Sequence, residues 1–444
     1  MPSKNSTGSE LKFSMQHAVG EVINYRDSWR IFRIISEIVE GYQFLQKLNR
    51  EVTILGSARL PSNNKYYKVA RELGKLLAKH GFTTMTGGGP GIMEAANRGA
   101  SEAGGSSVGL NIQLPFEQRI NPYVKESIGF YYFYTRKIML TSPANAFVFF
   151  PGGFGTMDEL FEVVDYMELG LMDKSPLIFV GKEFWSPLIK FLRQNCSGIA
   201  HSVDEKNLNE WQVVDTAEEA FELIKDVQDR SNSCTIDSTS PFCQIGTEWN
   251  IFRILAELVN GFEMLTKIHN DVTVLGTHSI VPGSKYYDAA YEVGKILAKN
   301  QFTTITGGGP GIQEAASRGA FEHGGESVGF DIRFDGKERI NNYLTKSMGF
   351  FFPFVRKLMI TAPSKAFVFM PGGFGTLHQL FEILTLQETQ KMPLIPTILY
   401  DRVFWQPMLD FIRTMFTEYK TISKDDQDLI QVIDKPEQVL QSLI

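Results

Sequence analysis

Two kinds of segment carry residues that could do chemistry, and each kind occurs twice along the chain. The segment PGGFGTMDEL contains Glu159, whereas its later copy PGGFGTLHQL has Gln379 at the same place. In a capping box that starts at Thr156 or Thr376, glutamate and glutamine would cap the helix equally well. Only the glutamate can carry a negative charge or accept a proton. If this position is chemical rather than structural, the second copy has lost the chemistry.

The other kind of segment is rich in glycine: GGGPGIMEA begins at Gly87 and GGGPGIQEA begins at Gly307. A dinucleotide fingerprint is excluded because Glu94 stands where its third glycine should be, and a Walker A loop is excluded because no Gly-Lys-Ser/Thr follows. Plain strand-to-helix turns are one interpretation. Two such loops in one parallel sheet favour an anion site instead, because helix N-termini attract anions and glycines let the backbone approach closely.

An arginine–lysine pair, Arg136 and Lys137, lies in the aromatic stretch FYYFYTRKIML and recurs as Arg356 and Lys357. Charged residues on a helix usually form a solvated face, but a pair set among aromatic residues is a stronger candidate for function. No histidine lies in a motif of the first copy, so neither a Ser–His–Asp triad nor a histidine-ligated metal is predicted there. No metal or other cofactor is expected.

Alternating strands and helices must position these segments. Short apolar runs such as VTILG, TTMTG, SVGLNI, AFVFF and PLIFVG alternate with helical stretches, which is typical of parallel βαβ units. Strands that are apolar on both faces indicate helices on both sides of the sheet. Both kinds of glycine segment follow strands, so they should lie at the carboxyl edge, where ligands bind. The sequence predicts an α/β fold of two tandem Rossmann-like domains, each a parallel sheet with helices on both faces.

Long matching stretches show that the duplication covers most of the chain. WRIFRIISEIVEGYQFL matches WNIFRILAELVNGFEML, and TTMTGGGPGIMEAANRGA matches TTITGGGPGIQEAASRGA. Two copies are too few for a solenoid, so a domain duplication is predicted. We expect a polar N-terminal extension over 1–28, a first domain over 29–226, a linker over 227–248 and a second domain over 249–444.

Composition and charge bound the possible partners. The net charge is −6, and the 444 residues contain no sustained run of lysine and arginine, which argues against binding to nucleic acid. No apolar run approaches the roughly 18 residues of a membrane span, and the N-terminus lacks the apolar core of a signal peptide. The three cysteines have neither disulfide nor zinc spacing. We expect a cytoplasmic protein that binds neither nucleic acid nor membranes.

Taken together, the segments GSAR, GGGPGIMEA, LPFEQ and PGGFGTMDE and the arginine–lysine pair resemble the LOG ("lonely guy") family. Its members are nucleoside 5′-monophosphate phosphoribohydrolases, many once labelled lysine decarboxylases. The resemblance implies that a nucleoside monophosphate of the AMP or cytokinin riboside type is hydrolysed to free base and ribose 5-phosphate. By matching position, Glu159 and Arg136 would be catalytic. The substrate and its phosphate would be bound by Ser57, Arg59, Gly87, Gly88, Gly89, Gly91, Glu94, Lys137, Gly152, Gly153, Gly155 and Thr156.

The second copy departs from the family pattern at several positions. Serine replaces Arg59, glutamine replaces Met93, histidine replaces Asp158, and FDGKE replaces LPFEQ, which places Lys337 opposite Glu117. A degenerate second site, able to hold phosphate without hydrolysis, is expected at Arg356, Gly372, Gly373, Gly375, Thr376 and Gln379. Because family members are dimers, the two halves should form an intramolecular pseudo-dimer, which could assemble into a further homo-oligomer. The second half would complete the first site or sense nucleotide.

Other functions fit the same pattern. Nucleotide-binding or molybdenum-cofactor-binding carriers and sensors share the fold and similar glycine loops, and fold alone does not assign chemistry. A carrier would need neither Glu159 nor Arg136, so their presence in the first copy favours an enzyme. A scaffold with two inactive copies would leave unexplained why the changes concentrate in the second copy.

Overall fold

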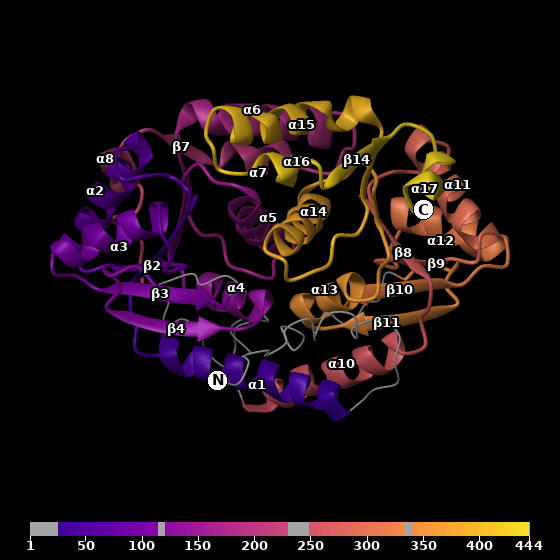
Figure 1. The fold of residues 1–444 in the computed structure, drawn as a ribbon, viewed down its shortest axis with the longest axis horizontal. Coiled ribbons are helices and arrows are strands. Elements are labelled where there is room, and N and C mark those ends of the chain that lie inside the picture. Colours follow the sequence, from indigo (N-terminus) through magenta and orange to yellow (C-terminus); the bar gives the residue numbers. More distant parts are fainter. Residues whose placement is uncertain (1–24, 114–119, 230–247, 334–339, 444) are drawn as a thin grey trace, which may run out of the picture.

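The computed structural model describes residues 25–113, 120–229, 248–333 and 340–443, and it shows two halves with the same sequence of elements (Figure 1). The first half contains α1 (Tyr25–Leu45), β1 (Glu51–Leu55), α2 (Lys65–Lys79), β2 (Thr83–Thr86), α3 (Ile92–Glu102), β3 (Ser107–Ile112), β4 (Glu126–Phe130), α4 (Phe133–Thr141), β5 (Ala146–Phe149), α5 (Phe154–Glu168), β6 (Leu177–Val180), α6 (Lys182–Phe191), the π-helix η1 (Leu192–Ser197), α7 (Glu205–Asn209), β7 (Gln212–Val214) and α8 (Ala217–Glu222).

The second half repeats this order from the helix that begins at Glu248. Its elements are α10 (Glu248–Leu265), β8 (Asp271–Leu275), α11 (Lys285–Lys299), β9 (Thr303–Thr306), α12 (Ile312–Glu322), β10 (Ser327–Ile332), β11 (Lys346–Phe350), α13 (Pro353–Thr361), β12 (Phe367–Phe369), α14 (Phe374–Glu388), β13 (Thr397–Tyr400), α15 (Arg402–Thr417), α16 (Lys424–Gln427), β14 (Ile430–Ile433) and α17 (Gln438–Leu443).

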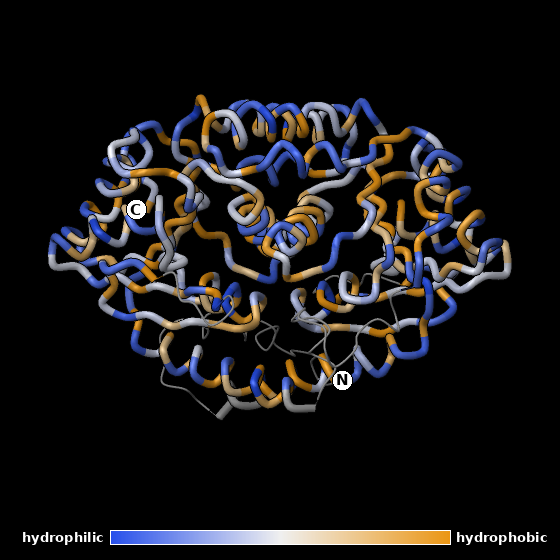
Figure 2. The backbone as a smooth tube through the Cα atoms, turned by 180° about the vertical axis from the view of Figure 1, so that it is seen from behind, coloured by the Kyte–Doolittle hydropathy of each residue, from blue (hydrophilic) through white to orange (hydrophobic). Residues whose placement is uncertain are grey.

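Each half is built on one 7-stranded, fully parallel sheet, with the orders β4-β3-β2-β1-β5-β6-β7 and β11-β10-β9-β8-β12-β13-β14. Apolar side chains fill both faces: Val52 and Ile54 pack in one cluster with α2, α3 and α8, while Leu55 packs in another with α1, α4 and α5. Figure 2 shows the hydrophobic colour gathered in the strands and at the centre of the molecule. The predicted fold class is confirmed.

The strand order explains where the chemistry gathers. The chain leaves β1 towards β2 on one side of the sheet and later returns to β5 on the other side. The loops that follow β1, β2 and β5 therefore meet at a topological switch point, where parallel sheets leave room for a ligand. The two outer strands of each sheet, β4 and β7 in the first half, were not expected, because ESIGF is largely exposed and QVV is very short.

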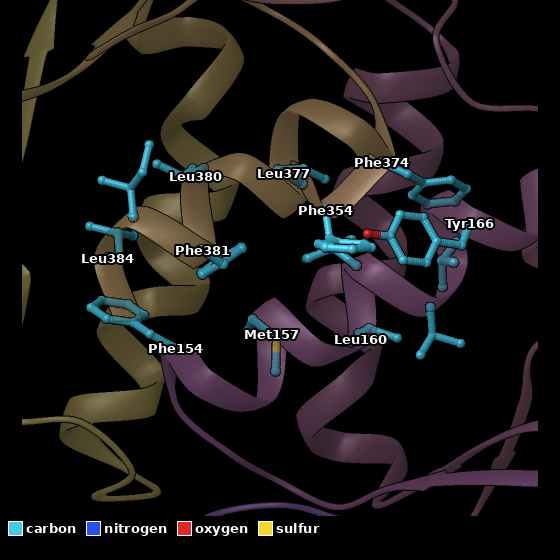
Figure 3. Packing of buried hydrophobic residues seen from close by; sticks show 14 of the residues in the cluster. Phe154, Met157, Leu160, Tyr166, Phe354, Phe374, Leu377, Leu380, Phe381 and Leu384 are labelled. Carbon is cyan, nitrogen blue, oxygen red and sulfur yellow. The ribbon is translucent and has the colours of Figure 1, made fainter. Parts of the chain in front are cut away.

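The two halves pack directly against each other through α5 and α14, which lie side by side at the centre of Figure 1. Apolar side chains of both helices gather where they cross, with Met157 and Leu160 on α5 and Leu377 and Phe381 on α14 (Figure 3). The rings of Phe161 and Phe381 stack with centroids 5.6 Å apart and an interplanar angle of 10°. Such a pair contributes about 0.5–1.5 kcal/mol beyond the area it buries. The halves thus form the predicted intramolecular pair; a further homo-oligomer stays a prediction.

Two further helix pairs, α6 with α15 and α1 with α10, also join the halves at opposite sides of the molecule (Figure 1). Within the described ranges, none of the helices combines the length and apolar character needed to cross a lipid bilayer.

Candidate active site

A cavity of about 310 Å³ lies beyond the carboxyl ends of β1, β2 and β5, at the border between the two halves. Most of its lining comes from the first half, in the loops after these strands and in the first turns of α4 and α5. The wall opposite comes from the end of α14 and from the segment before α16. The residues that line it are Leu55, Gly56, Ser57, Ala58, Arg59, Gly87, Met93, Ile112, Phe133, Arg136, Gly153, Phe154, Gly155, Thr156, Glu159, Thr385, Glu388, Thr389 and Thr421.

Arg136 and Glu159 form an ion pair in this cavity, with Nη2 of the arginine donating to Oε1 of the glutamate over 2.6 Å. Each side chain is only 11% exposed. Burial raises the pKa of Glu159, although Arg136 and Lys137 act in the opposite direction. A carboxylate with a raised pKa takes up a proton more readily than an exposed one. The pair therefore offers a proton acceptor held in place by a cation.

Arg136 keeps further capacity to bind. Its Nε is buried and has no hydrogen-bond partner among the residues that the structure describes. The guanidinium lies 5.5 Å from the centre of the Phe133 ring, which also lines the cavity. Because a buried donor without a partner is costly, this nitrogen is a candidate to bind a ligand.

The loop PGGFGT starts α5 differently from what the sequence predicts. The N-cap is Gly153, without a side-chain cap, so Thr156 already lies in the first turn and Glu159 in the second. The predicted capping box is wrong for Thr156 and Glu159, and also for Thr376 and Gln379, because α14 likewise begins after Gly373. The helix starts directly after the strand-end glycines, which leaves the carboxylate of Glu159 available to Arg136.

The loop GGGPG supports the cavity mostly from behind. Gly88 and Gly91 have φ of +71° and +67°, and a Cβ on Gly91 would lie 2.3 Å from the carbonyl oxygen of Ser57. Asn121 donates from Nδ2 to the carbonyl oxygens of Gly88 and Gly89, at 3.1 and 3.0 Å. Asn121 was not among the predicted residues. Its signal was repetition, because Asn341 stands at the equivalent place and makes the same bonds to the second loop.

The predicted binding residues divide into two groups. Eight predicted residues line the cavity: Ser57, Arg59, Gly87, Arg136, Gly153, Gly155, Thr156 and Glu159. Six others lie outside this lining: Gly88, Gly89, Gly91, Glu94, Lys137 and Gly152. Glu94 accepts a hydrogen bond of 2.8 Å from the hydroxyl of Tyr67. The segments LPFEQ and FDGKE, with Glu117 and Lys337, lie outside the described residues.

Lys137 was predicted to bind the substrate, but the structure places it elsewhere. Its ammonium group lies at the interface of the halves, 3.0 Å from Asp158, 3.5 Å from Glu382 and 3.7 Å from Glu162. Successive residues of a helix point in different directions, so Arg136 faces the cavity while its neighbour faces α5 and α14. Lys137 serves the interface rather than the cavity.

Four residues of the second half line the cavity and were not predicted: Thr385, Glu388, Thr389 and Thr421. Glu388 accepts a hydrogen bond of 2.7 Å from Arg59, which also lies 3.5 Å from Asp426. Burial, with a smaller contribution from Asp426, raises the pKa of Glu388 to about 7. These contacts join a first-half arginine to second-half carboxylates, so both halves build one site.

The equivalent residues of the second half are arranged differently. Arg356 donates from Nε to the carbonyl oxygen of Phe330 over 2.7 Å. Gln379 is buried. The predicted residues Gly372, Gly373, Gly375 and Thr376 lie at the start of α14, as their counterparts do in α5. Within the described ranges, histidine, cysteine, aspartate and glutamate side chains form no group of three or more that could hold a metal ion.

One protein family and several known proteins are similar to parts of this chain. The family described as "Possible lysine decarboxylase" matches residues 93–224 and again 313–443. The cytokinin riboside 5′-monophosphate phosphoribohydrolase of Rhodococcoides fascians is 26% identical over 146 residues, which cover 32% of this chain and 74% of that protein. A protein of the same name from Arabidopsis thaliana is 25% identical over 215 residues, covering 47% of this chain and 92% of the relative. Among solved structures, the molybdenum cofactor carrier protein from Chlamydomonas reinhardtii is 23% identical and covers 40% of this chain and 96% of its own, with a TM-score of 0.31.

Proposed function

The chain belongs to the LOG family, whose model carries the description "Possible lysine decarboxylase", and we propose that its first half is a nucleoside 5′-monophosphate phosphoribohydrolase. The reaction would release the free base and ribose 5-phosphate from a nucleotide of the AMP or cytokinin riboside monophosphate type. Relatives that carry this activity in their names match at about a quarter identity.

The chemistry asks for a carboxylate beside the sugar. As the bond between C1′ and the base nitrogen breaks, its electron pair goes to the base and positive charge develops on the ribose. Glu159 stabilises that charge and accepts a proton from the water that attacks C1′, and this proton ends on the departing base. Arg136, 2.6 Å from Glu159, orients the carboxylate. The unpartnered Nε of Arg136 would donate a hydrogen bond to the substrate.

The phosphate end of the nucleotide would lie against the start of α5. Gly153, Gly155 and Thr156 line the cavity there, and the first turn of a helix leaves backbone N–H groups without partners inside the helix. Binding energy from the phosphate positions the ribose for the reaction. The second half would be structural, since it closes the cavity with the end of α14.

The single observation that carries the proposal is the buried Arg136–Glu159 pair, in a cavity that also contains the start of α5. A carrier of nucleotide or molybdenum cofactor needs a cradle but no proton acceptor inside it. The second half supports the same conclusion, because it keeps the glycines and has Gln379 where the acceptor would be.

The test is release of free base from a panel of nucleoside 5′-monophosphates, AMP included, separated by chromatography. Glu159→Gln should lower the rate by about 10²–10⁴-fold, the usual contribution of a positioned acid or base, while nucleotide binding persists. Glu72→Gln, on the exposed face of α2, is the matched loss of a carboxylate and should leave release unchanged. Equal rates for Glu159→Gln and the wild type would refute the assignment. Binding without release from any nucleotide would favour the carrier.

A further inference from the structure

Thr385 is a second-half residue with an unsatisfied hydroxyl at the first-half cavity. It lies on α14, is 3% exposed and lines the cavity. Its Oγ1 is buried and finds no hydrogen-bond partner in the described part of the chain. Buried hydroxyls are nearly always hydrogen-bonded. Nearby Thr389 differs, because its hydroxyl donates 2.6 Å to the carbonyl oxygen of Thr385.

The position of Thr385 matches the phosphate end of the proposed substrate. A Cβ built on Gly155 would lie 3.8 Å from Cγ2 of Thr385, so the threonine side chain packs directly on the glycine loop that begins α5. Its methyl and hydroxyl groups share one carbon, and a rotation about χ1 exchanges them. The hydroxyl can therefore reach an anion held by the loop.

A residue of the first half likewise reaches the glycine loop PGGFGT of the second half. Asp165, on α5, stands at the position of Thr385 in the repeat and faces the glycine loop of the second half. A Cβ on Gly375 would lie 3.0 Å from Oδ1 of Asp165. The other oxygen, Oδ2, lies 3.6 Å from His378 and 3.9 Å from Lys357. The second-half loop thus faces a carboxylate where the first-half loop faces a threonine.

We propose that the side chain that crosses from the opposite half decides which cleft accepts a 5′-phosphate. Thr385 donates its hydroxyl to a phosphate at the first-half loop, and the carboxylate of Asp165 keeps a phosphate away from the second-half loop because like charges repel at this distance. The inference deepens the proposed function and rests on it. It also differs from the expectation that the second site still holds phosphate.

The first part of the test measures binding of ribose 5-phosphate to the full chain by calorimetry, with unphosphorylated ribose as the control. The wild type should bind one molecule per chain. Thr385→Val keeps the shape but removes the hydroxyl, and should weaken binding by about tenfold or more, the usual effect of losing a hydrogen bond to a charged group. Thr385→Ser keeps the hydroxyl and should bind like the wild type. Equal affinity for the valine and serine variants would overturn the role of Thr385.

The second part of the test asks whether a second site can be opened. Asp165→Thr should raise the stoichiometry to two molecules per chain, and Asp165→Asn, which keeps the size but removes the charge, should do so as well. One molecule per chain in both variants, with unchanged thermal melting, would overturn the role of Asp165.

The two proposals fail in different ways. Normal base release, with binding indifferent to both positions, would remove this inference and leave the proposed function standing. Absent base release, with the expected stoichiometries, would remove hydrolysis and leave the phosphate selectivity standing.

Discussion

The loops at the strand ends of the two halves follow the same strand order, but the equivalent arginines of the two halves bind different partners. Arg136 holds the Glu159 carboxylate at 2.6 Å, whereas Arg356 holds the backbone carbonyl of Phe330 at 2.7 Å. Burial lowers the pKa of Arg356, although Asp331 and Asp165 act against this effect. Gln379 offers no charge to attract the guanidinium. Glu159 thus gives Arg136 a carboxylate partner, whereas Arg356 bonds a backbone carbonyl.

In the second half, a side chain of the same half binds the backbone of the loop GGGPG. Gln313 accepts a hydrogen bond of 2.9 Å from the backbone N–H of Gly309. The first half has Met93 at this position, with Sδ near Gly87, and a thioether is only a weak acceptor. The second cleft has therefore changed at several places, at Gln313, Arg356, Gln379 and the crossing Asp165. We infer that Gln379→Glu alone does not create a second active site.

The buried lysines of the interface differ as strongly as the clefts. Burial alone lowers the pKa of Lys137, but the carboxylates of Asp158, Glu162 and Glu382 outweigh it and raise the pKa above its usual value. Lys357 contacts His378 and lies 3.9 Å from the carboxylate of Asp165, and burial lowers its pKa. One lysine thus balances a cluster of carboxylates, and the other is poorly compensated.

The largest expected effect is on stability, when each of these two buried lysines is replaced. Lys137→Met would leave buried carboxylates without their cation and should lower the free energy of unfolding by about 3–5 kcal/mol. Lys357→Met should cost about 1 kcal/mol or less, because it removes a charge that the surroundings already disfavour. Urea denaturation of the two variants beside the wild type gives both values. Equal losses would show that the two lysines play the same role.

The next effect concerns catalysis. Arg136→Lys keeps the charge but loses the planar guanidinium that bonds Glu159, and should lower kcat/KM for base release by about 10²-fold. Arg356→Lys, the same change in the second half, should lower it by less than about threefold, because Arg356 bonds the backbone of its own half. Steady-state rates of base release from AMP give kcat/KM for both variants, and thermal melting checks that each variant is folded. A large loss for Arg356→Lys would mean that the second cleft contributes to turnover.

Local patterns were enough to predict the fold and eight of the fifteen first-half residues that line the cavity. Apolar strand runs, glycine segments at strand ends and the repeat itself are short-range features, so the parallel sheets and the paired halves followed from them. The family resemblance and the rule that ligands bind at the carboxyl edge assigned both Arg136 and Glu159 to the site, but left open whether Arg136 would meet the phosphate or the carboxylate. Each of these signals is carried within one copy.

The second half was expected to complete the first site, but the residues that cross between the halves could not be predicted. Thr385 reaches the first cavity only because α14 packs on α5. The residues around Thr385 in the sequence show no pattern that predicts this contact. Lys137 was expected at the cavity because its neighbour Arg136 was, but it lies at the interface between the halves. The direction of each side chain depends on how α4 packs, which the sequence pattern does not specify. The capping box failed because α5 begins one turn earlier than the Thr-x-x-Glu pattern suggests.

The smallest predicted effect tests what the two halves share. Burial raises the pKa of Glu51, at the start of β1, to about 7, and burial raises that of Asp271, at the start of β8, to about 7. Each carboxyl group has one oxygen that is buried and lacks a hydrogen-bond partner within the described residues. The folded chain therefore holds these protons to higher pH than the unfolded chain does. Between the ordinary carboxyl pKa and about 7, stability should fall as the pH rises.

Glu51→Gln and Asp271→Asn remove this titration. Relative to the wild type, each should gain on the order of 1–2 kcal/mol of stability between pH 5 and pH 8, measured by urea denaturation at the two values. Similar gains would mean that the halves keep the same scaffold chemistry while their clefts have diverged. Lys365 acts to lower the pKa of Asp271, whereas Asp229 acts to raise that of Glu51. Raising the salt concentration should therefore increase the Asp271→Asn gain and decrease the Glu51→Gln gain. A gain in only one half would show that divergence has reached the sheet as well as the clefts.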